Sequence, residues 1–202
     1  MTIKTKSEAI FESFCKRHGL VWEKIPEEIF PTPDYVIYLD SQTIYFELKQ
    51  IDNDKNFDKS GKGASSSIVG SHIRKKISDS KKQVQTGAKK DASSVLLVYN
   101  NLDPLQSFGT EQCDFIAAMY GEMTLRIRVN DSQVVDSFQG RNSLLQESHN
   151  TSFSAVGHLS HTIDGASILL YENIYALNPL DIELLPSCIE FRRIEPQYLS
   201  GF

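Results

Sequence analysis

Apolar residues near the start of the chain recur at the spacing of an α-helix. Positions three or four apart hold apolar side chains: Ile10, Phe11, Phe14 and Cys15. This stripe predicts a helix that begins near Ser7, a residue able to cap it, and ends at Gly19. A short strand is expected at residues 20–23, after which three prolines interrupt the chain. Because its apolar residues lie on one face, the helix is expected to pack on a core through that face, which holds Cys15.

The next segments change between strand and helix patterns. Residues 35–39 and 44–51 are rich in Tyr, Ile, Val and Phe, which predicts two strands. Residues 52–70 have the composition of a mobile loop, and a thin apolar stripe predicts a helix over residues 71–85. The continuous apolar run at residues 93–99 is typical of a strand buried on both faces. Up to residue 100 the predicted order is αβββαβ.

The second half of the chain is less regular. A helix is expected at residues 111–120 and a loop at residues 137–151. Further strands are expected at residues 124–129, 152–159, 168–171 and 189–193. The prediction is one α/β domain over residues 1–202, with a mixed central sheet and flanking helices. Its core lies at about residues 7–100, and residues 101–202 form a β-rich elaboration on the same sheet.

Composition bears on where in the cell the protein is expected. No apolar run approaches the ~20 residues that a membrane span needs, and no long apolar segment follows the first lysines, so neither a membrane segment nor a signal peptide is expected. The three cysteines are widely spaced, which disfavours a disulfide framework and a zinc ribbon. We therefore expect a cytoplasmic protein.

Charge is unevenly distributed along the chain. The net charge is −5, yet residues 49–90 hold 11 Lys/Arg against 4 Asp/Glu. A basic segment inside an acidic chain is typical of a surface that faces phosphates, although a solvated lysine-rich helix has the same composition.

The two strands at residues 35–39 and 44–51 also predict a hairpin with chemistry on one face. If Asp40 and Ser41 form a two-residue turn, Asp34 lies opposite Glu47, and Lys49 shares their face. The other face then collects the apolar side chains, so the register that buries them also gathers two carboxylates and an ammonium group.

Two carboxylates at this separation repel each other and require a compensating charge. Oxygen ligands favour Mg²⁺ or Mn²⁺ over zinc. Such an ion binds a phosphate oxygen and activates a bound water, and a nearby lysine stabilises the charge that develops during phosphodiester hydrolysis.

Pro33-Asp34, twelve intervening residues and Glu47-Leu48-Lys49 resemble the PD-(D/E)xK signature of the restriction-endonuclease-like nuclease superfamily. The αβββαβ order over residues 7–100 is similar to the core of that superfamily. The resemblance implies that Asp34 and Glu47 are metal ligands and that Lys49 is the catalytic lysine. It also implies a Mg²⁺-dependent nuclease, with DNA as the expected substrate.

The resemblance implies two further site residues. Members often add a carboxylate from the first helix, and Glu8 stands at the expected distance before Gly19, with Glu12 as the alternative. A lysine or glutamine often follows on the helix after the ExK strand. Gln83 is the best candidate for that position, and Lys82 and Gln85 are the alternatives.

Basic residues of the loop and of the second helix are expected to approach a nucleic-acid backbone: Lys62, Arg74, Lys75, Lys81 and Lys82. Two other readings stay open. One is a nuclease-like fold that binds DNA or protein without cleaving. The other is an interaction protein whose residues 137–162 form an interface, with a homodimer or another protein as partner.

Other motifs carry weaker signals. His158 and His161 form an HxxH pair without a third ligand, and Gly61-Lys62-Gly63 lacks the full pattern of a phosphate loop. Trp22 and Tyr38 are able to stack on bases, but packing is the ordinary role of such side chains.

Overall fold

The computed structural model describes residues 4–27 and 29–194, and this part of the chain contains three α-helices, one 3-10 helix and nine strands. The α-helices are α1 (Lys6–Arg17), α2 (Ser71–Ala88) and α3 (Gln112–Tyr120), and the 3-10 helix η1 is Ile182–Leu184. The strands are β1 (Val21–Lys24), β2 (Tyr35–Tyr38), β3 (Thr43–Ile51), β4 (Ser93–Asn100), β5 (Glu122–Ile127), β6 (Val134–Arg141), β7 (Ala155–Thr162), β8 (Gly165–Glu172) and β9 (Ile189–Arg192).

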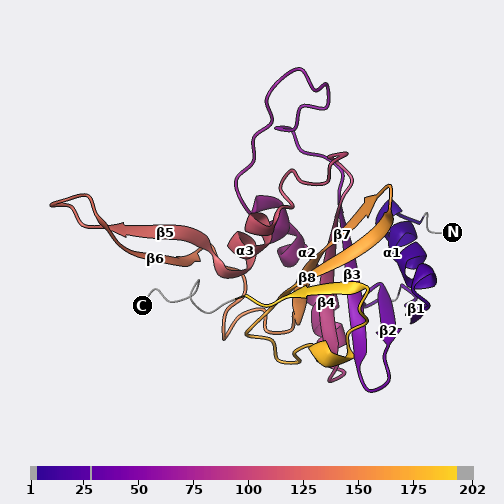
Figure 1. Ribbon diagram of the computed structural model, residues 1–202. Helices are drawn as coiled ribbons and strands as arrows, with labels where there is room; N and C mark the ends of the chain where they lie inside the picture. The colour runs from indigo at the N-terminus through magenta and orange to yellow at the C-terminus, as the bar shows by residue number, and fades with distance from the viewer. Residues whose placement is uncertain (1–3, 28, 195–202) are drawn as a thin grey trace.

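Seven strands form one mixed sheet in the order β1-β2-β3-β4-β7-β8-β9 (Figure 1). The three central strands β3, β4 and β7 are parallel to one another. Strand β2 is antiparallel to both β1 and β3, and β8 is antiparallel to β7 but parallel to the edge strand β9. Every residue of β4 is buried, because apolar side chains cover both of its faces.

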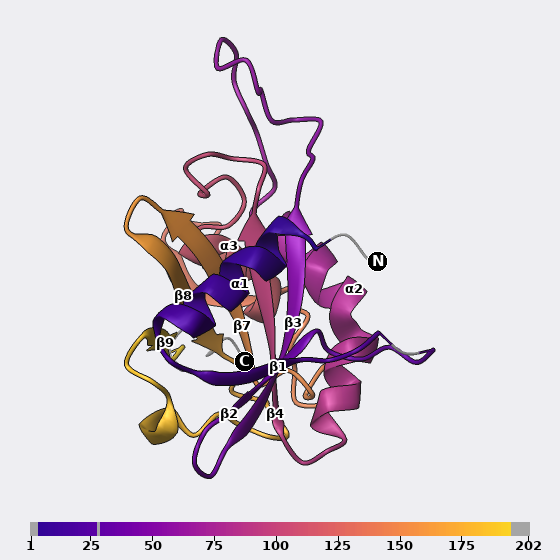
Figure 2. The same cartoon turned by 90° about the vertical axis from the view of Figure 1, so that its right-hand side faces the viewer.

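Helices cover the two faces of the sheet. On one face, Phe11 and Phe14 of α1 pack against apolar side chains of β2, β3 and β7. On the other face, Ile73 and Ile77 of α2 pack with Phe115 of α3. Figure 2 shows α1 in front of the sheet. The sheet is thus the middle layer between α1 and the α2–α3 pair.

The predicted α/β architecture is confirmed at this level. The elements up to Asn100 follow the order αβββαβ, and β7, β8 and β9 extend the same sheet. Cys15 is buried on the core face of α1, as expected. No helix in the described part of the chain combines the length and apolar composition that a membrane span needs.

Two local predictions are wrong. The N-cap of α1 is Thr5, not Ser7, because the Thr5 hydroxyl accepts a bond from the backbone N–H of Glu8 while the Glu8 carboxylate accepts one from that of Thr5. Residues 137–141, predicted as part of a loop, belong to β6, whose pairing with β5 was not foreseen.

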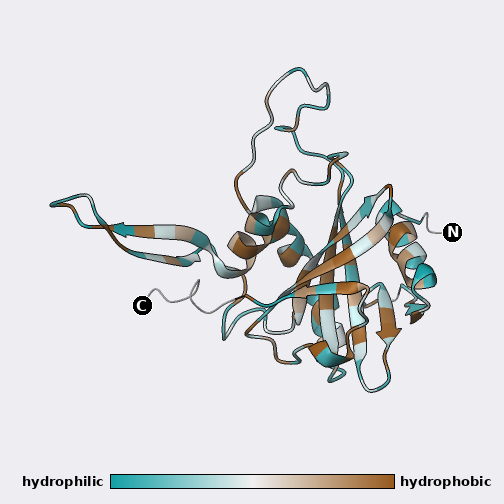
Figure 3. Cartoon of the chain, viewed as in Figure 1, coloured by the Kyte–Doolittle hydropathy of each residue, from teal (hydrophilic) through white to brown (hydrophobic). Residues whose placement is uncertain are grey.

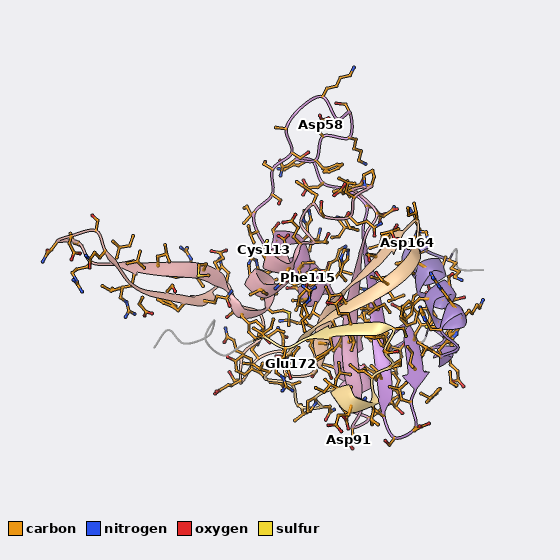
Figure 4. The ribbon with its side chains drawn as sticks, in the orientation of Figure 1. Asp58, Asp91, Cys113, Phe115, Asp164 and Glu172 are labelled. Atoms are coloured by element: carbon orange, nitrogen blue, oxygen red, sulfur yellow. The ribbon has the colours of Figure 1, made fainter. Side chains whose placement is uncertain are left out.

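Two segments extend away from the layered body. The strands β5 and β6 form a separate two-stranded ribbon, which projects beside α3 (Figure 1). Residues 52–70 form the long loop between β3 and α2, with Asp58 near its tip (Figure 4). The Asp58 carboxylate accepts hydrogen bonds from the backbone N–H groups of Ser60 and Gly63, so this loop folds around an acidic side chain.

Candidate active site

The hairpin of β2 and β3 has the predicted register. Tyr35 pairs with Phe46, and the backbone N–H of Leu39 donates to the carbonyl of Gln42 at 2.9 Å. Just before β2, the N–H of Asp34 donates to the carbonyl of Phe46 at 3.0 Å. Asp34 therefore lies where the register places it, next to Glu47 of the neighbouring strand.

Three polar side chains meet at this point. The ammonium group of Lys49 lies 2.6 Å from Oε1 of Glu47, and Oδ2 of Asp34 accepts a bond from the backbone N–H of Leu48 at 2.7 Å. Glu47 is only 2% exposed, and its Oε2 has no hydrogen-bond partner among the described residues. The centre therefore retains one free buried carboxylate oxygen.

Burial and mutual repulsion change the protonation of the two acids. Burial first, and then the charge of Asp34, raise the pKa of Glu47 to about 7 against the opposing effect of Lys49. Burial also raises the pKa of Asp34, although the Leu48 N–H and Lys49 partly offset this effect. A single ammonium group thus compensates two carboxylates incompletely.

This donor set fits a hard divalent cation. Mg²⁺ typically keeps several waters and binds proteins through one or two carboxylates, and Asp34 and Glu47 supply two. Within the described residues there is no group of three or more His, Cys, Asp or Glu side chains arranged to hold a metal ion. A third carboxylate, histidine or cysteine ligand from these residues would therefore require a side chain to move.

Glu8 lies close enough to Asp34 for its charge to raise the pKa of that carboxyl group, but other groups hold it. Its Oε1 lies 2.5 Å from the ammonium group of Lys24, and its Oε2 accepts from the backbone of Thr5. Burial alone would raise the pKa of Glu8, and these bonds hold it below its ordinary value. The alternative residue, Glu12, is engaged differently: it pairs with Lys4 and accepts a bond from the Tyr35 hydroxyl.

Helix α2 runs back along β3 and brings further groups near the site. Gly87 lies so close to Tyr45 that an added Cβ would be 3.0 Å from the Tyr45 Cβ. The other end of α2 approaches the end of β3. Burial lowers the pKa of Lys76 there, and the nearby charge of Lys49 contributes to the same shift. The half-buried Gln83 lies between these two points. Its side chain makes no hydrogen bond to Asp34, Glu47 or Lys49 within the described structure.

Lys76 lies near the candidate site, and the sequence analysis did not single it out. Lys76 lies four residues before the buried Ser80 and seven before Gln83. At this spacing the three side chains lie on the same side of α2, next to its buried apolar residues. The i, i+4, i+7 spacing of these polar residues could have indicated a shared helix face. It was not recognised because Lys76 is one of several lysines in this segment.

The other residues expected to face a phosphate backbone differ in exposure and in whether their side chains already have hydrogen-bond partners. Lys62, Lys75 and Lys82 are exposed. Arg74 instead donates to the carbonyls of Val69 and Ala117, at 2.6 and 3.1 Å. Lys81 lies 3.1 Å from Nε2 of His149. The three exposed lysines are therefore the ones most available to a polyanion.

The weaker sequence motifs gain little from the structure. His158 and His161 are three positions apart on β7, so they point to opposite faces of the sheet and do not converge on one ion. Burial lowers the pKa of His158 to about 4. Trp22 packs against the core near Tyr35, and the exposed Tyr38 donates to Glu23.

No protein-family model matches the chain, and no curated protein or solved structure matches it at a significant level. The relation to the PD-(D/E)xK superfamily therefore remains a hypothesis that rests on Asp34, Glu47, Lys49 and the order of the elements.

Proposed function

We propose that this protein is a Mg²⁺- or Mn²⁺-dependent nuclease that hydrolyses phosphodiester bonds of nucleic acid, with DNA as the expected substrate. The observation that carries the proposal is the buried Glu47 carboxylate, which has one oxygen free beside Asp34 and the other paired with Lys49. In an ordinary buried ion pair, all the polar atoms have hydrogen-bond partners. A buried carboxylate oxygen without one therefore requires an explanation.

In the proposed site, Asp34 and Glu47 would hold the cation. Bound there, the ion would supply Lewis acidity toward a phosphate oxygen and lower the pKa of a coordinated water. The raised pKa values of the two acids are consistent with this role, since a cation would replace the missing positive charge.

Lys49 and Lys76 act on the charge of the reacting phosphate in this proposal. Lys49 is fixed by Glu47 at the end of a rigid strand, so its ammonium group is positioned before the substrate arrives. Lys76 approaches from α2, and its partial burial reduces competition from water. Together they place two cations around one point on the sheet.

The most direct test of activity is cleavage of a linear DNA duplex and of single-stranded DNA by wild type and Glu47→Ala in the presence of Mg²⁺. We expect cleavage by wild type and a loss of at least about 100-fold in the variant, because both the ion and Lys49 lose their partner. Glu190→Gln is the matched control, since Glu190 is an exposed strand carboxylate on the edge strand β9. Undiminished cleavage by Glu47→Ala would refute the proposal.

A further inference from the structure

The β5–β6 ribbon has one apolar face that no part of the described chain covers. Met123, Leu125 and Ile127 alternate along β5 and point to the same side. Leu125 is 52% exposed and Ile127 53% exposed, and Val129 and Val134 near the turn are also exposed. Figure 3 shows that apolar positions continue along the ribbon outside the layered body.

The opposite face of the ribbon carries one aromatic side chain, the half-buried Phe138 under the guanidinium group of Arg126, and is otherwise polar with balanced charges. Arg126 pairs with Asp136 across the two strands, and Arg128 pairs with Asp131 in the turn. The ribbon therefore carries no excess of positive charge for a polyanion. Its apolar face is the feature that distinguishes it from an ordinary surface hairpin.

A groove begins where the ribbon leaves the body. It has a volume of about 830 Å³, and its walls come from α3, the base of the ribbon and the segment before α2. Ile68, Ile116 and Ile194 make it apolar, and Met123 belongs to both the groove and the ribbon face. Oε1 of Gln139 also lines it, buried and without a hydrogen-bond partner. The groove and the ribbon face thus form one continuous apolar surface.

We propose that this surface binds a second copy of the same chain, so that the ribbon of each copy lies in the groove of the other. A two-fold axis relates such copies, and the same ribbon–groove contact occurs twice. The inference does not depend on the proposed nuclease activity.

Stability favours a covering partner. An isolated two-stranded ribbon is marginally stable in water, and this one extends from the body (Figure 1) with Leu125 and Ile127 exposed. The exposed aliphatic side chains leave on the order of 500 Å² of apolar surface, the size of the largest patch on a typical monomer. Two reciprocal contacts, with the groove walls added, reach the ~1,200 Å² at which specific interfaces begin.

Charge and position favour a second copy over a nucleic acid. The ion pairs of the ribbon are satisfied within it, so no net charge attracts a polyanion or repels a second copy. The ribbon also leaves the body on the side away from α1, β1 and β2 (Figure 1), so Asp34 and Glu47 stay uncovered in this arrangement.

Sedimentation velocity over a range of protein concentrations tests the proposal. We expect wild type to have twice the mass of the chain at micromolar concentration and to dissociate on dilution. Leu125→Ser combined with Ile127→Ser should weaken association at least about 100-fold, as expected when buried anchor residues are lost. Thr124→Ser combined with Arg126→Ser is the matched control, because these residues lie on the other face of the ribbon.

Cys113 provides a second measurement that does not depend on a variant. Its thiol is exposed and lines the groove, on the first turn of α3 near the base of the ribbon (Figure 4). The proposal predicts slower alkylation of Cys113 at high protein concentration than at low concentration, while the buried Cys15 stays protected at both. A wild-type chain that is monomeric throughout, or a Cys113 rate independent of concentration, would overturn the proposal.

Discussion

Glu47 lies on a strand whose neighbouring residues are buried, with Lys49 bound to one carboxylate oxygen and no partner for the other. Burial is the main cause that raises the pKa of Glu47 to about 7, and the neighbouring charge of Asp34, which shares the one ammonium group, adds to it. Such an arrangement costs stability at neutral pH in the absence of a cation, and the proposed metal-binding role would explain its presence.

Replacing Glu47 with glutamine is expected to stabilise the metal-free protein above pH 7. The ordinary pKa of 4.5 rises to about 7 on folding, so the native state binds more protons than the unfolded state between these values. Wild type therefore loses stability as the pH rises through this window, by about 3 kcal/mol for such a shift. Urea denaturation of both proteins at pH 4 and pH 8, with a chelator, measures the difference.

The gap between Glu47→Gln and wild type should be large at pH 8 and nearly absent at pH 4. Glu190→Gln should show no comparable dependence, since Glu190 is exposed. An equal difference in the free energy of unfolding at both pH values would mean that Glu47 is not held in a strained ionised state.

The sequence was sufficient to predict that Asp34, Glu47 and Lys49 lie together, because the register that buries Ile44 and Phe46 also sets which polar residues share the other face. It was not sufficient for Lys76. Its role depends on how α2 lies on β3, which is a tertiary property of the packing.

At the scale of elements, α2 is fixed to the sheet by its close approach to β3 and β4. Gly87 permits this contact, since an added Cβ would lie 2.5 Å from Oγ of Ser94 and 3.0 Å from the Cβ of Tyr45. The position of Lys76 and Gln83 relative to Glu47 follows from this contact.

Gly87→Ala is therefore expected to destabilise the protein. Alanine favours a helix by about 1 kcal/mol over glycine, but the overpacked contact costs about 1–3 kcal/mol, so we expect a net loss of about 1 kcal/mol. Chemical denaturation of Gly87→Ala and of Gln85→Ala, an exposed neighbour on the same helix, measures it. A Gly87→Ala variant more stable than Gln85→Ala would show that α2 does not lie this close to the sheet.

Element prediction from sequence succeeded where a buried face imposed a period. The strands of the hairpin and the helix α2 each bury one or both faces, so their apolar residues recur at a regular spacing in the sequence. Only one strand of the ribbon was predicted, because the apolar side chains of β5 face solvent and β6 contains Ser137 and Gly140, which are typical of turns. The cap of α1 was misplaced by two residues, although Thr5 and Glu8 have the spacing of a capping box.

At the scale of the whole molecule, the acidic chain concentrates its positive charge on residues 49–90, which form the end of β3, the long loop and α2. The exposed lysines of α2, Lys75 and Lys82, belong to the helix that covers the face of the sheet opposite α1. A polyanion is therefore expected to approach from the α2 side.

Replacing Lys75 and Lys82 together with alanine is expected to weaken DNA binding and reduce its dependence on salt. Each phosphate contact contributes a slope of about 0.9 in the logarithmic salt plot, so the slope should fall by up to about 2. Fluorescence anisotropy at several salt concentrations measures this. Lys16→Ala, an exposed lysine on α1, is the control. The same loss in the control and in the double variant would contradict binding through α2.

Titration of Mg²⁺ by calorimetry, on wild type, Asp34→Asn and Glu47→Gln, tests the central claim most directly. We expect wild type to bind the ion with an affinity that rises as the pH increases through about 7, because metal binding must displace the protons held by these acids. Both variants should lose the binding, and Glu190→Gln should retain it. Wild type that binds no divalent ion, or variants that bind as tightly as wild type, would contradict a metal-dependent nuclease at Asp34 and Glu47.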